Sequence, residues 1–333
     1  MSERTYNITV IPGDGIGREV IPAAVAALEA TGRSFHYTYA DAGWECFQRN
    51  GTALPDQTLA AAQAADAVLF GAVASPSFPV VGYRSPIVAL RRALDLFANI
   101  RPVSGGRADL VVVRENTEGL YSGRERVSDD GNTAITERVI TRQASERIVR
   151  LAFDLARTRA AKHVTIVHKA NVLRETCGLF RKVALEVASE YPTIRYDEML
   201  VDNCALQLIQ RPERFDVVVT TNLFGDIISD VASYWGGGLG VAVSANIGTT
   251  RALFEPVHGA APDIVGQGIA NPLAAIGCAA LLLEYLGEHA WAERVRNIVT
   301  EAISEGPQTP DLGGSATTAQ VTAWVVDRIG RAN

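Results

Sequence analysis

Two spacings of apolar residues alternate along the chain and predict strands and helices in turn. The run "FDVVVTT" at 215–221 is short and rich in β-branched residues, which is typical of a buried strand. Runs of this kind predict strands at 8–11, 35–39, 67–73, 110–113, 164–167, 194–201 and 216–221. Helical spacing predicts helices at 20–30, 57–65, 85–97, 145–157, 175–189, 203–210, 272–286, 290–304 and 316–329. This order predicts an α/β fold, with a largely parallel sheet flanked by helices on both faces.

The segment 121–141 breaks this order. It contains two polar, alternating stretches around "SDDGN", whose Asp-Gly pair favours a hairpin turn. An antiparallel arm on an α/β body is typical of an oligomer contact. A solvated surface flap is the alternative that the residues leave open.

Composition narrows the possible functions. The 333 residues are 47% hydrophobic, which is enough for a large core in two lobes. The net charge of −6 argues against nucleic acid as a partner, and the four scattered cysteines indicate neither a zinc site nor a disulfide framework. The N-terminal residues show no secretory pattern, and the longest apolar run, 274–283, is too short to cross a bilayer. We therefore expect a soluble cytoplasmic protein with no membrane partner.

Two aspartates follow the strand that ends at 221. Asp226 and Asp230 are four residues apart in a helix predicted to open after Gly225, so both carboxylates lie on one face. Asp202 opens "VDNCALQL", where another strand runs into a helix. Acids at the mouth of an α/β sheet fit a hard cation, Mg²⁺ or Mn²⁺, that takes oxygen ligands. A solvated helix start, favoured by the helix dipole, is the alternative.

Three arginines lie close together in the sequence and add a second kind of chemistry. Arg91, Arg101 and Arg114 occur in "ALRRALDLFANIRP" and "VVVREN", with Arg92 expected to face solvent. One such arginine usually makes a structural ion pair. Several of them beside a cluster of acids indicate a pocket for a polycarboxylate, because guanidinium groups bind carboxylates through two hydrogen bonds.

Two further side chains are candidates for proton transfer. Lys169 in "VTIVHKANV" follows a core strand, where a lysine is unusual, although a lysine reaching to solvent from a strand end is the ordinary explanation. Tyr121 in "VRENTEGLY" has a half-buried packing role as its ordinary explanation.

The glycines of "GDGIG" do not match a dinucleotide fingerprint. They fall at 13, 15 and 17, which is not the G-x-G-x-x-G spacing, so an ordinary Rossmann site is rejected. The long loop "EPVHGAAPDIVGQGIANP" at 255–272 is the remaining candidate for binding a nucleotide.

Taken together, these motifs resemble a known family. "IPGDGIG", "VRENTEGLY", "HKANVL", "DNCALQL", "NLFGDIISD" and "EPVHGAAPDIVGQGIANP" are similar, in order and over nearly the whole chain, to the β-decarboxylating dehydrogenases. That family includes isocitrate, isopropylmalate and homoisocitrate dehydrogenases. "RENTEGLY" and the stretch from "VDNCALQL" to "NLFGDI" most resemble the homoisocitrate dehydrogenases of lysine biosynthesis through aminoadipate.

The resemblance implies roles for individual residues. Asp226 and Asp230, with the partner subunit's Asp202, would hold the metal, while Lys169 of the partner subunit would act as base and Tyr121 as acid. The residues implied to bind substrate are Ser75, Ser85, Val88, Arg91, Arg101, Arg114, Tyr121, Lys169 and Asn171. Those implied to bind the cofactor are Val73, Ala74, Ser75, Asn171, His258, Gly259, Ala260, Ala261, Asp263 and Asn271.

The resemblance also implies a cofactor and an assembly. Asp263 would accept hydrogen bonds from the adenosine ribose and repel a 2′-phosphate, and NADP-dependent relatives carry a Lys-Tyr pair at this position, so NAD is expected. The implied assembly is a homodimer with shared active sites, joined in part by the arm at 121–141, and pairing of dimers into a tetramer is left open. The implied lobes are discontinuous: 1–97 with 237–333 for the cofactor, and 98–236 for substrate, metal and dimerisation.

The resemblance leaves a choice of substrate. Ser85 matches the serine that isocitrate dehydrogenases direct at a distal carboxylate, whereas Val88 stands where some homoisocitrate dehydrogenases carry an arginine. Isopropylmalate enzymes usually read "RELTGG" where this chain has "RENTEG". NAD-dependent oxidation of homoisocitrate to 2-oxoadipate and CO₂ is the expected activity. Isocitrate and 3-isopropylmalate are the alternatives, and a non-catalytic regulatory subunit of the same fold is a remote one.

Overall fold

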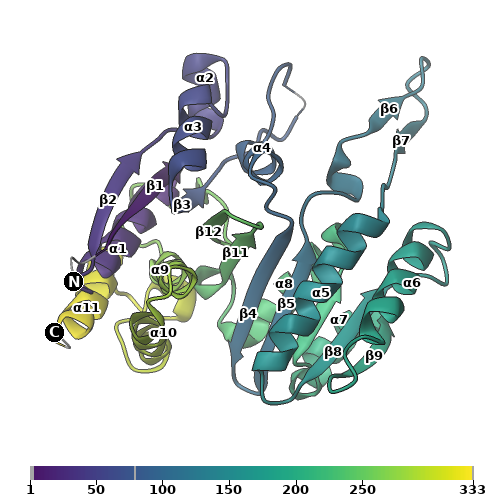
Figure 1. Ribbon diagram of the computed structural model, residues 1–333. Coiled ribbons are helices and arrows are strands. Elements are labelled where there is room, and N and C mark those ends of the chain that lie inside the picture. Colours follow the sequence, from purple (N-terminus) through teal and green to yellow (C-terminus); the bar gives the residue numbers. More distant parts are fainter. Residues whose placement is uncertain (1–3, 79, 332–333) are drawn as a thin grey trace. The chain divides into compact units, whose positions relative to one another are not determined.

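The chain forms two compact units, each with its own part of the sheet (Figure 1). The computed structural model describes residues 4–78 and 80–331. Unit 1 contains Met1–Leu96 and Gly237–Asn333, and unit 2 contains Phe97–Gly236. Among the described residues, no helix combines the length and the apolar character needed to cross a membrane.

The described residues of unit 1 form five strands, in the order β2-β1-β3-β12-β11, parallel except for β11. Its helices α3 and α4 pack on one face, over a cluster that includes Val68, Phe70 and Leu90. The elements are β1 (Thr5–Gly13), α1 (Gly17–Glu29), β2 (Ser34–Tyr39), α2 (Trp44–Asn50), α3 (Asp56–Ala64), β3 (Ala67–Ala72), α4 (Pro86–Ala93), β11 (Val243–Ile247), β12 (Ala252–Pro256), α9 (Leu273–Tyr285), α10 (His289–Ser304) and α11 (Thr318–Gly330).

Unit 2 has strands in the order β4-β5-β10-β8-β9, parallel except for β4. Its elements are β4 (Ala98–Gly105), β5 (Ala108–Glu115), the 3-10 turn η1 (Leu120–Ser122), β6 (Glu125–Val127), β7 (Ala134–Thr136), α5 (Arg142–Thr158), β8 (His163–His168), α6 (Thr176–Ala188), β9 (Arg195–Leu200), α7 (Val201–Gln210), β10 (Val217–Thr220) and α8 (Asn222–Ser233). The strands β6 and β7 form the antiparallel arm that projects from this unit in Figure 1.

Alternating side chains place unit 2's core on both faces of its sheet. Val111 and Val113 of β5 pack with α5 and α6, whereas Leu110 and Val112 point the other way and pack with α7 and α8. Strands covered on both faces need nearly continuous apolar runs, which is the pattern that predicted them. The prediction of an α/β fold with a largely parallel sheet is confirmed.

Several local predictions were wrong. The helix expected at 85–97 ends at Ala93, because Asp95 takes a left-handed conformation (φ 45°) and the chain then enters β4. The strands β4, β11 and β12 and the short helix α2 were not expected. Helix α8 begins at Asn222, three residues before Gly225, and so includes the glycine that was taken as its boundary.

Candidate active site

One face of α8 carries a network of polar contacts in unit 2. Its polar and small residues follow the spacing i, i+3, i+4, i+7 and i+8, so they form a single stripe along the helix: Asn222, Gly225, Asp226, Ser229 and Asp230. The stripe lies against the neighbouring strands β4 and β5, which carry Arg101 and Arg114.

Arg114 is buried beneath the first half of this stripe, with 2% of its side chain exposed. Its guanidinium donates to the Asp226 carboxylate and, at 3.1 and 2.8 Å, to Oδ1 of Asn222. A Cβ atom on Gly225 would lie 2.6 Å from Cβ and Cγ of Arg114. A glycine is therefore required inside α8 for the helix to approach the arginine this closely.

Arg101 lies beneath the second half of the stripe. Its Nη1 donates to Ser229 Oγ at 2.7 Å and to Asp230 Oδ1 at 2.9 Å, and its Nη2 donates to Asp226 Oδ1 at 3.3 Å. Asn99 accepts from its Nε at 2.9 Å. Two buried guanidinium groups thus offset the repulsion between two carboxylates one turn apart, which explains how the like charges are tolerated.

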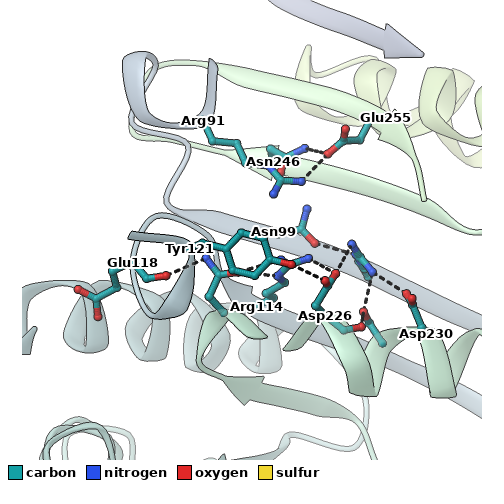
Figure 2. A network of polar contacts seen from close by, with 12 residues as sticks. Arg91, Asn99, Arg114, Glu118, Tyr121, Asp226, Asp230, Asn246 and Glu255 are labelled. Atoms are coloured by element: carbon teal, nitrogen blue, oxygen red, sulfur yellow. Dashed lines mark hydrogen bonds and ion pairs between the residues drawn. The ribbon is translucent and has the colours of Figure 1, made fainter. Parts of the chain in front are cut away.

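Tyr121 approaches the same carboxylate from the turn that follows β5. Its hydroxyl donates to Asp226 Oδ2 at 2.7 Å (Figure 2). Burial raises the pKa of Tyr121, and the hydrogen bond to Asp226 raises it further, so the phenol keeps its proton at neutral pH. The side chains of Asp226 and Asp230 remain 32% and 50% exposed, which leaves carboxylate oxygens accessible for a ligand. Burial also raises the pKa of Asp230, although Arg101 opposes this.

Lys169 lies elsewhere in unit 2, in the turn after β8, and pairs with Asp202 on α7. The hydrogen bond from Lys169 lowers the pKa of Asp202. The Lys169 amide donates to the Cys177 sulfur at 3.3 Å and the Ala170 amide donates to His168 Nδ1 at 3.2 Å, so the backbone of the turn is anchored on both sides.

The three predicted metal ligands are not brought together by one chain. Among residues 4–78 and 80–331, no group of three or more His, Cys, Asp or Glu side chains is arranged to hold a metal ion. The structure brings Asp226 and Asp230 together and leaves Asp202 with Lys169. Two adjacent, accessible carboxylates fit a hard divalent cation as part of its oxygen ligands, the remainder coming from another source.

Unit 1 contains the third predicted arginine in a separate cluster. Arg91 on α4 donates to Glu255 Oε1 at 2.9 Å, and Asn246 Nδ2 donates to the same oxygen at 2.8 Å. The side chain of Arg91 is 10% exposed, whereas Arg92 is exposed, as the sequence predicted. Ser85 occupies the N-cap position of α4, and Val88 follows at helical spacing on the side of Arg91, half-buried.

The "GDGIG" turn supports the loop at 255–272. The Ile16 amide donates to the Ala260 carbonyl at 3.0 Å, and the Gly266 amide donates to Glu19 Oε1 at 2.7 Å. Gly15 has φ 54°, and a Cβ atom there would lie 2.2 Å from the Ala260 oxygen. The glycine permits this close approach between the turn and the loop.

The loop itself combines anchored and exposed residues. Asn271 is held by Asp311 at 3.0 Å and by the Leu273 amide, while Ala261 adopts a left-handed φ of 41° and Asp263 is exposed. Nδ1 of His258 lies 3.0 Å from the Gly259 carbonyl, which assigns the ring proton to Nδ1. Within the described chain its Nε2 is buried without a hydrogen-bond partner, and burial lowers the pKa of His258. A neutral ring with an unused acceptor fits a loop that binds a hydrogen-bond donor of a nucleotide.

Asp14 is an organising residue that the sequence did not reveal. This buried carboxylate accepts from the amides of Trp44, Glu45 and Ala74 at 2.7, 3.0 and 2.9 Å. It thereby ties the start of α2 to the segment 73–75, where cofactor contacts from Val73, Ala74 and Ser75 were predicted.

Other residues of the network were also missed, and one signal was available for them. Asn222, Gly225 and Ser229 share the helical face of the two aspartates, so their spacing marks them as neighbours once α8 is extended to Asn222. Glu255 and Asn246 carried no such signal, because they meet Arg91 only through the pairing of β11 with β12.

Comparison with known proteins agrees with this geometry. The isocitrate/isopropylmalate dehydrogenase family matches residues 7–329. The isocitrate/homoisocitrate dehydrogenase of Thermus thermophilus is 54% identical over 97% of this chain and 98% of its own. The 3-isopropylmalate dehydrogenase of Archaeoglobus fulgidus is 51% identical over 94% and 96% of the two chains.

A solved structure gives the same result for the fold. The crystal structure of isocitrate dehydrogenase from Methylococcus capsulatus has a TM-score of 0.94 and 46% identity, covering 98% of this chain and 99% of its own. Matches of this identity and coverage, together with the arginine–carboxylate face of α8, identify the chain as an enzyme, a β-decarboxylating dehydrogenase that belongs to the isocitrate/isopropylmalate dehydrogenase family.

Proposed function

We propose that this enzyme catalyses the NAD-dependent oxidative decarboxylation of homoisocitrate to 2-oxoadipate and CO₂, a step of lysine biosynthesis through aminoadipate. The observation that carries the proposal is the face of α8, where two buried arginines and a protonated tyrosine surround two accessible carboxylates. The T. thermophilus relative named isocitrate/homoisocitrate dehydrogenase supports the choice of substrate.

The arginines would bind the substrate's carboxylates. Arg101 and Arg114 are held in fixed orientations by Asn99 and Asn222, so they are arranged before substrate arrives. Arg91 has the same character, with a buried guanidinium held by Glu255. We assign all three to carboxylate binding, and Ser85 with Val88 to the group on C3.

Proton transfers would fall to Lys169 and Tyr121. Lys169 would take the proton of the C2 hydroxyl, and NAD⁺, when bound, would supply the acceptor for the hydride of C2. Once CO₂ has left, C3 needs a proton, and the Tyr121 phenol can donate one, because a tyrosine is protonated at neutral pH even before burial raises its pKa. A Mg²⁺ or Mn²⁺ ion held by Asp226 and Asp230 would supply stabilisation of negative charge on the substrate's oxygen atoms.

The cofactor assignment rests on the 255–272 loop. We propose that His258, Gly259, Ala260, Ala261, Asp263 and Asn271, together with residues 73–75 and Asn171, bind NAD. The exposed Asp263 carboxylate supports NAD over NADP, because it would repel a 2′-phosphate.

We further propose a homodimer in which each site takes the partner subunit's Lys169 and the partner subunit's Asp202. Helices α7 and α8 support this, since they expose apolar side chains on the elements that carry the acids: Leu206 is 52%, Ile209 42% and Ile227 53% exposed. A second copy of the chain would cover this surface.

Comparing kcat/KM for homoisocitrate, isocitrate and 3-isopropylmalate, with NAD⁺ and Mg²⁺, tests the proposal. We expect homoisocitrate to be best and isocitrate to follow within roughly 10- to 200-fold, the range for one methylene. 3-Isopropylmalate is the second candidate, favoured by the A. fulgidus relative and by the apolar Val88. It would replace homoisocitrate if it gave the highest kcat/KM. A higher kcat/KM with NADP⁺ than with NAD⁺ would overturn the cofactor assignment.

A mixing experiment tests the shared site. The variants Lys169→Ala and Asp226→Asn are each expected to be inactive. If each site uses both chains, a heterodimer of the two variants contains one intact site, so co-refolding equal amounts restores about a quarter of wild-type activity. Absence of any recovery, with heterodimers demonstrated by differential tags, would contradict the shared site.

A further inference from the structure

Asn222 joins two parts of the network that the mechanism assigns to different tasks. It is the first residue of α8 and is 1% exposed. Its Oδ1 accepts from both Nε and Nη2 of Arg114, at 3.1 and 2.8 Å. Because a guanidinium can only donate, the amide orientation is fixed, and Nδ2 must face the other way. There it donates to the Glu118 carbonyl at 3.2 Å.

The Glu118 carbonyl belongs to the segment that positions Tyr121. Gly119 follows with φ 79°, and its amide donates to the Val139 carbonyl at 2.9 Å before the chain enters the turn η1. Tyr121 lies in that turn and donates to Asp226. The contacts therefore form a closed ring, from Asn222 through Arg114 and Asp226 to Tyr121 and back along the backbone to Glu118. Figure 2 shows the ring members Arg114, Asp226, Tyr121 and Glu118.

We infer that Asn222 is a positioning residue. It fixes the orientation of the Arg114 guanidinium directly and the position of the Tyr121 hydroxyl through the Glu118 carbonyl. The inference rests on the proposed function, since it assigns carboxylate binding to Arg114 and protonation of C3 to Tyr121. A carboxamide meets both requirements at once. It presents an acceptor to the arginine and a donor to the carbonyl, whereas a carboxylate supplies only acceptors and an apolar side chain supplies neither.

A purely structural role for Asn222 makes a different prediction. If it only fastened the start of α8 to β5, its loss would lower stability and leave substrate binding unchanged. If it positions Arg114 and Tyr121, its loss weakens binding of the hydroxy acid and slows turnover, while the KM for NAD⁺ stays constant. The two roles are separated by comparing effects on the two substrates in one variant.

The experiment uses the full-length enzyme and the variants Asn222→Ala and Asn222→Asp. For Asn222→Ala we expect the calorimetric Kd of the hydroxy acid to rise and kcat to fall, with kcat/KM lower by on the order of 10- to 100-fold and the KM for NAD⁺ unchanged. Asn222→Asp keeps an acceptor for Arg114, which favours a folded protein. It loses the donor to Glu118, so kcat falls at least about 10-fold.

Thr220→Val is the matched control. Thr220 is fully buried two residues before Asn222, and its hydroxyl donates to the Val167 carbonyl at 2.7 Å. This variant is expected to lower the melting temperature, with Kd and kcat within about twofold of wild type.

A double-mutant cycle with Arg114→Lys shows whether Asn222 acts through the arginine. Lysine cannot present the two donors that Asn222 accepts, so we expect Asn222→Ala to cost far less in kcat/KM in the Arg114→Lys background than in wild type. Independent, multiplying losses would overturn the inference, as would an Asn222→Ala variant that loses only melting temperature, like the control. A wild-type enzyme that oxidises none of the three acids would overturn the proposed function and this inference together, whereas an active wild type with an unaffected Asn222→Ala variant overturns the inference alone.

Discussion

The two units of the chain each bury an arginine–carboxylate cluster, and the clusters differ in how their acids meet solvent. In unit 1, Arg91 and Glu255 are both enclosed, with 10% and 12% of their side chains exposed. In unit 2, Arg101 is equally enclosed, at 10%, but Asp230 is 50% exposed. Both arrangements offset the cost of a buried guanidinium. Only the second leaves acid oxygens available to a cation, so exposure of the acids distinguishes a cluster that can bind a metal ion from one whose acid only holds an arginine in place.

The unit 2 cluster, whose acids are exposed, is called the open cluster, and the unit 1 cluster the closed one. The largest effect is expected when the open cluster loses Asp226, the acid that both of its arginines contact. In Asp226→Asn, Arg101 and Arg114 lose a shared counter-charge and the metal loses a ligand. We expect kcat/KM to fall by on the order of 10³-fold or more. The free energy of unfolding should fall by about 3 kcal/mol in urea titrations. In Asp230→Asn, turnover should be lost similarly but unfolding should change by less than about 1 kcal/mol, because Asp230 is half exposed.

Equal stability losses in the two aspartate variants would break the comparison. They would mean that exposure of the acid does not separate its folding role from its ligand-binding role.

The closed cluster of unit 1, Arg91 with Glu255, should contribute to stability much more than to turnover. Glu255→Gln leaves Arg91 buried without a neutralising charge, so we expect unfolding to lose about 3 kcal/mol while kcat/KM falls much less than in Asp226→Asn. Urea unfolding and steady-state kinetics on the same preparation measure both quantities. A loss of turnover as deep as that of Asp226→Asn would show that the unit 1 cluster is also a reaction centre.

Metal addition should act on the open cluster alone. At Mn²⁺ concentrations about 100 times the Kd, binding to the native state should stabilise the chelator-stripped wild type by about 2.7 kcal/mol. Calorimetric unfolding should show the same stabilisation in Glu255→Gln and little of it in Asp230→Asn. If the ion stabilised Asp230→Asn as strongly as wild type, Asp230 would not be a ligand.

The smallest effect concerns an acid that is exposed and lies outside both clusters. Replacing Asp263 by asparagine removes the charge expected to repel a 2′-phosphate, so the ratio of kcat/KM for NAD⁺ to that for NADP⁺ should fall roughly 10-fold. The exposed acid Glu293 on α10 gives the matched control, Glu293→Gln, for which the ratio should stay constant. An unchanged ratio in Asp263→Asn would remove this residue from cofactor selection.

Sequence patterns were sufficient for the elements that are apolar by themselves. The strands β8 and β10 contain continuous runs of β-branched residues, 164–167 and 217–220, buried on both faces, and were predicted. The strand β4 was missed because "ANIRPVSG" places an arginine and a proline inside it. Arg101 is compatible with a strand only because its guanidinium reaches Asp226 and Asp230, on a helix more than a hundred residues later in the chain. Local strand propensity depends on neighbouring residues only, so it cannot predict a contact this distant in the sequence.

The site shows the same limit. The acids, arginines, Lys169 and Tyr121 stood out as polar chemistry in apolar surroundings, and the family resemblance supplied their roles. Asn222 and Ser229 share the helical spacing of the two aspartates, but that spacing shows only that they lie on one face of the helix, not that two arginines lie beneath it. Their importance arises from the packing of α8 on β4 and β5, which depends on how the strands pair. Whether the three acids meet in a dimer stays a prediction.

The interruption of unit 1 by unit 2 has a consequence for biosynthesis. The strands β1, β2 and β3 leave the ribosome before unit 2, yet β3 pairs with β12, which is translated only after the whole of unit 2. Unit 2 is contiguous and can complete its own sheet during elongation, while the nascent strands β1, β2 and β3 keep an open edge until β12 has been translated. A chain released from the ribosome after Leu96 would therefore be a fragment with an exposed sheet edge prone to aggregation.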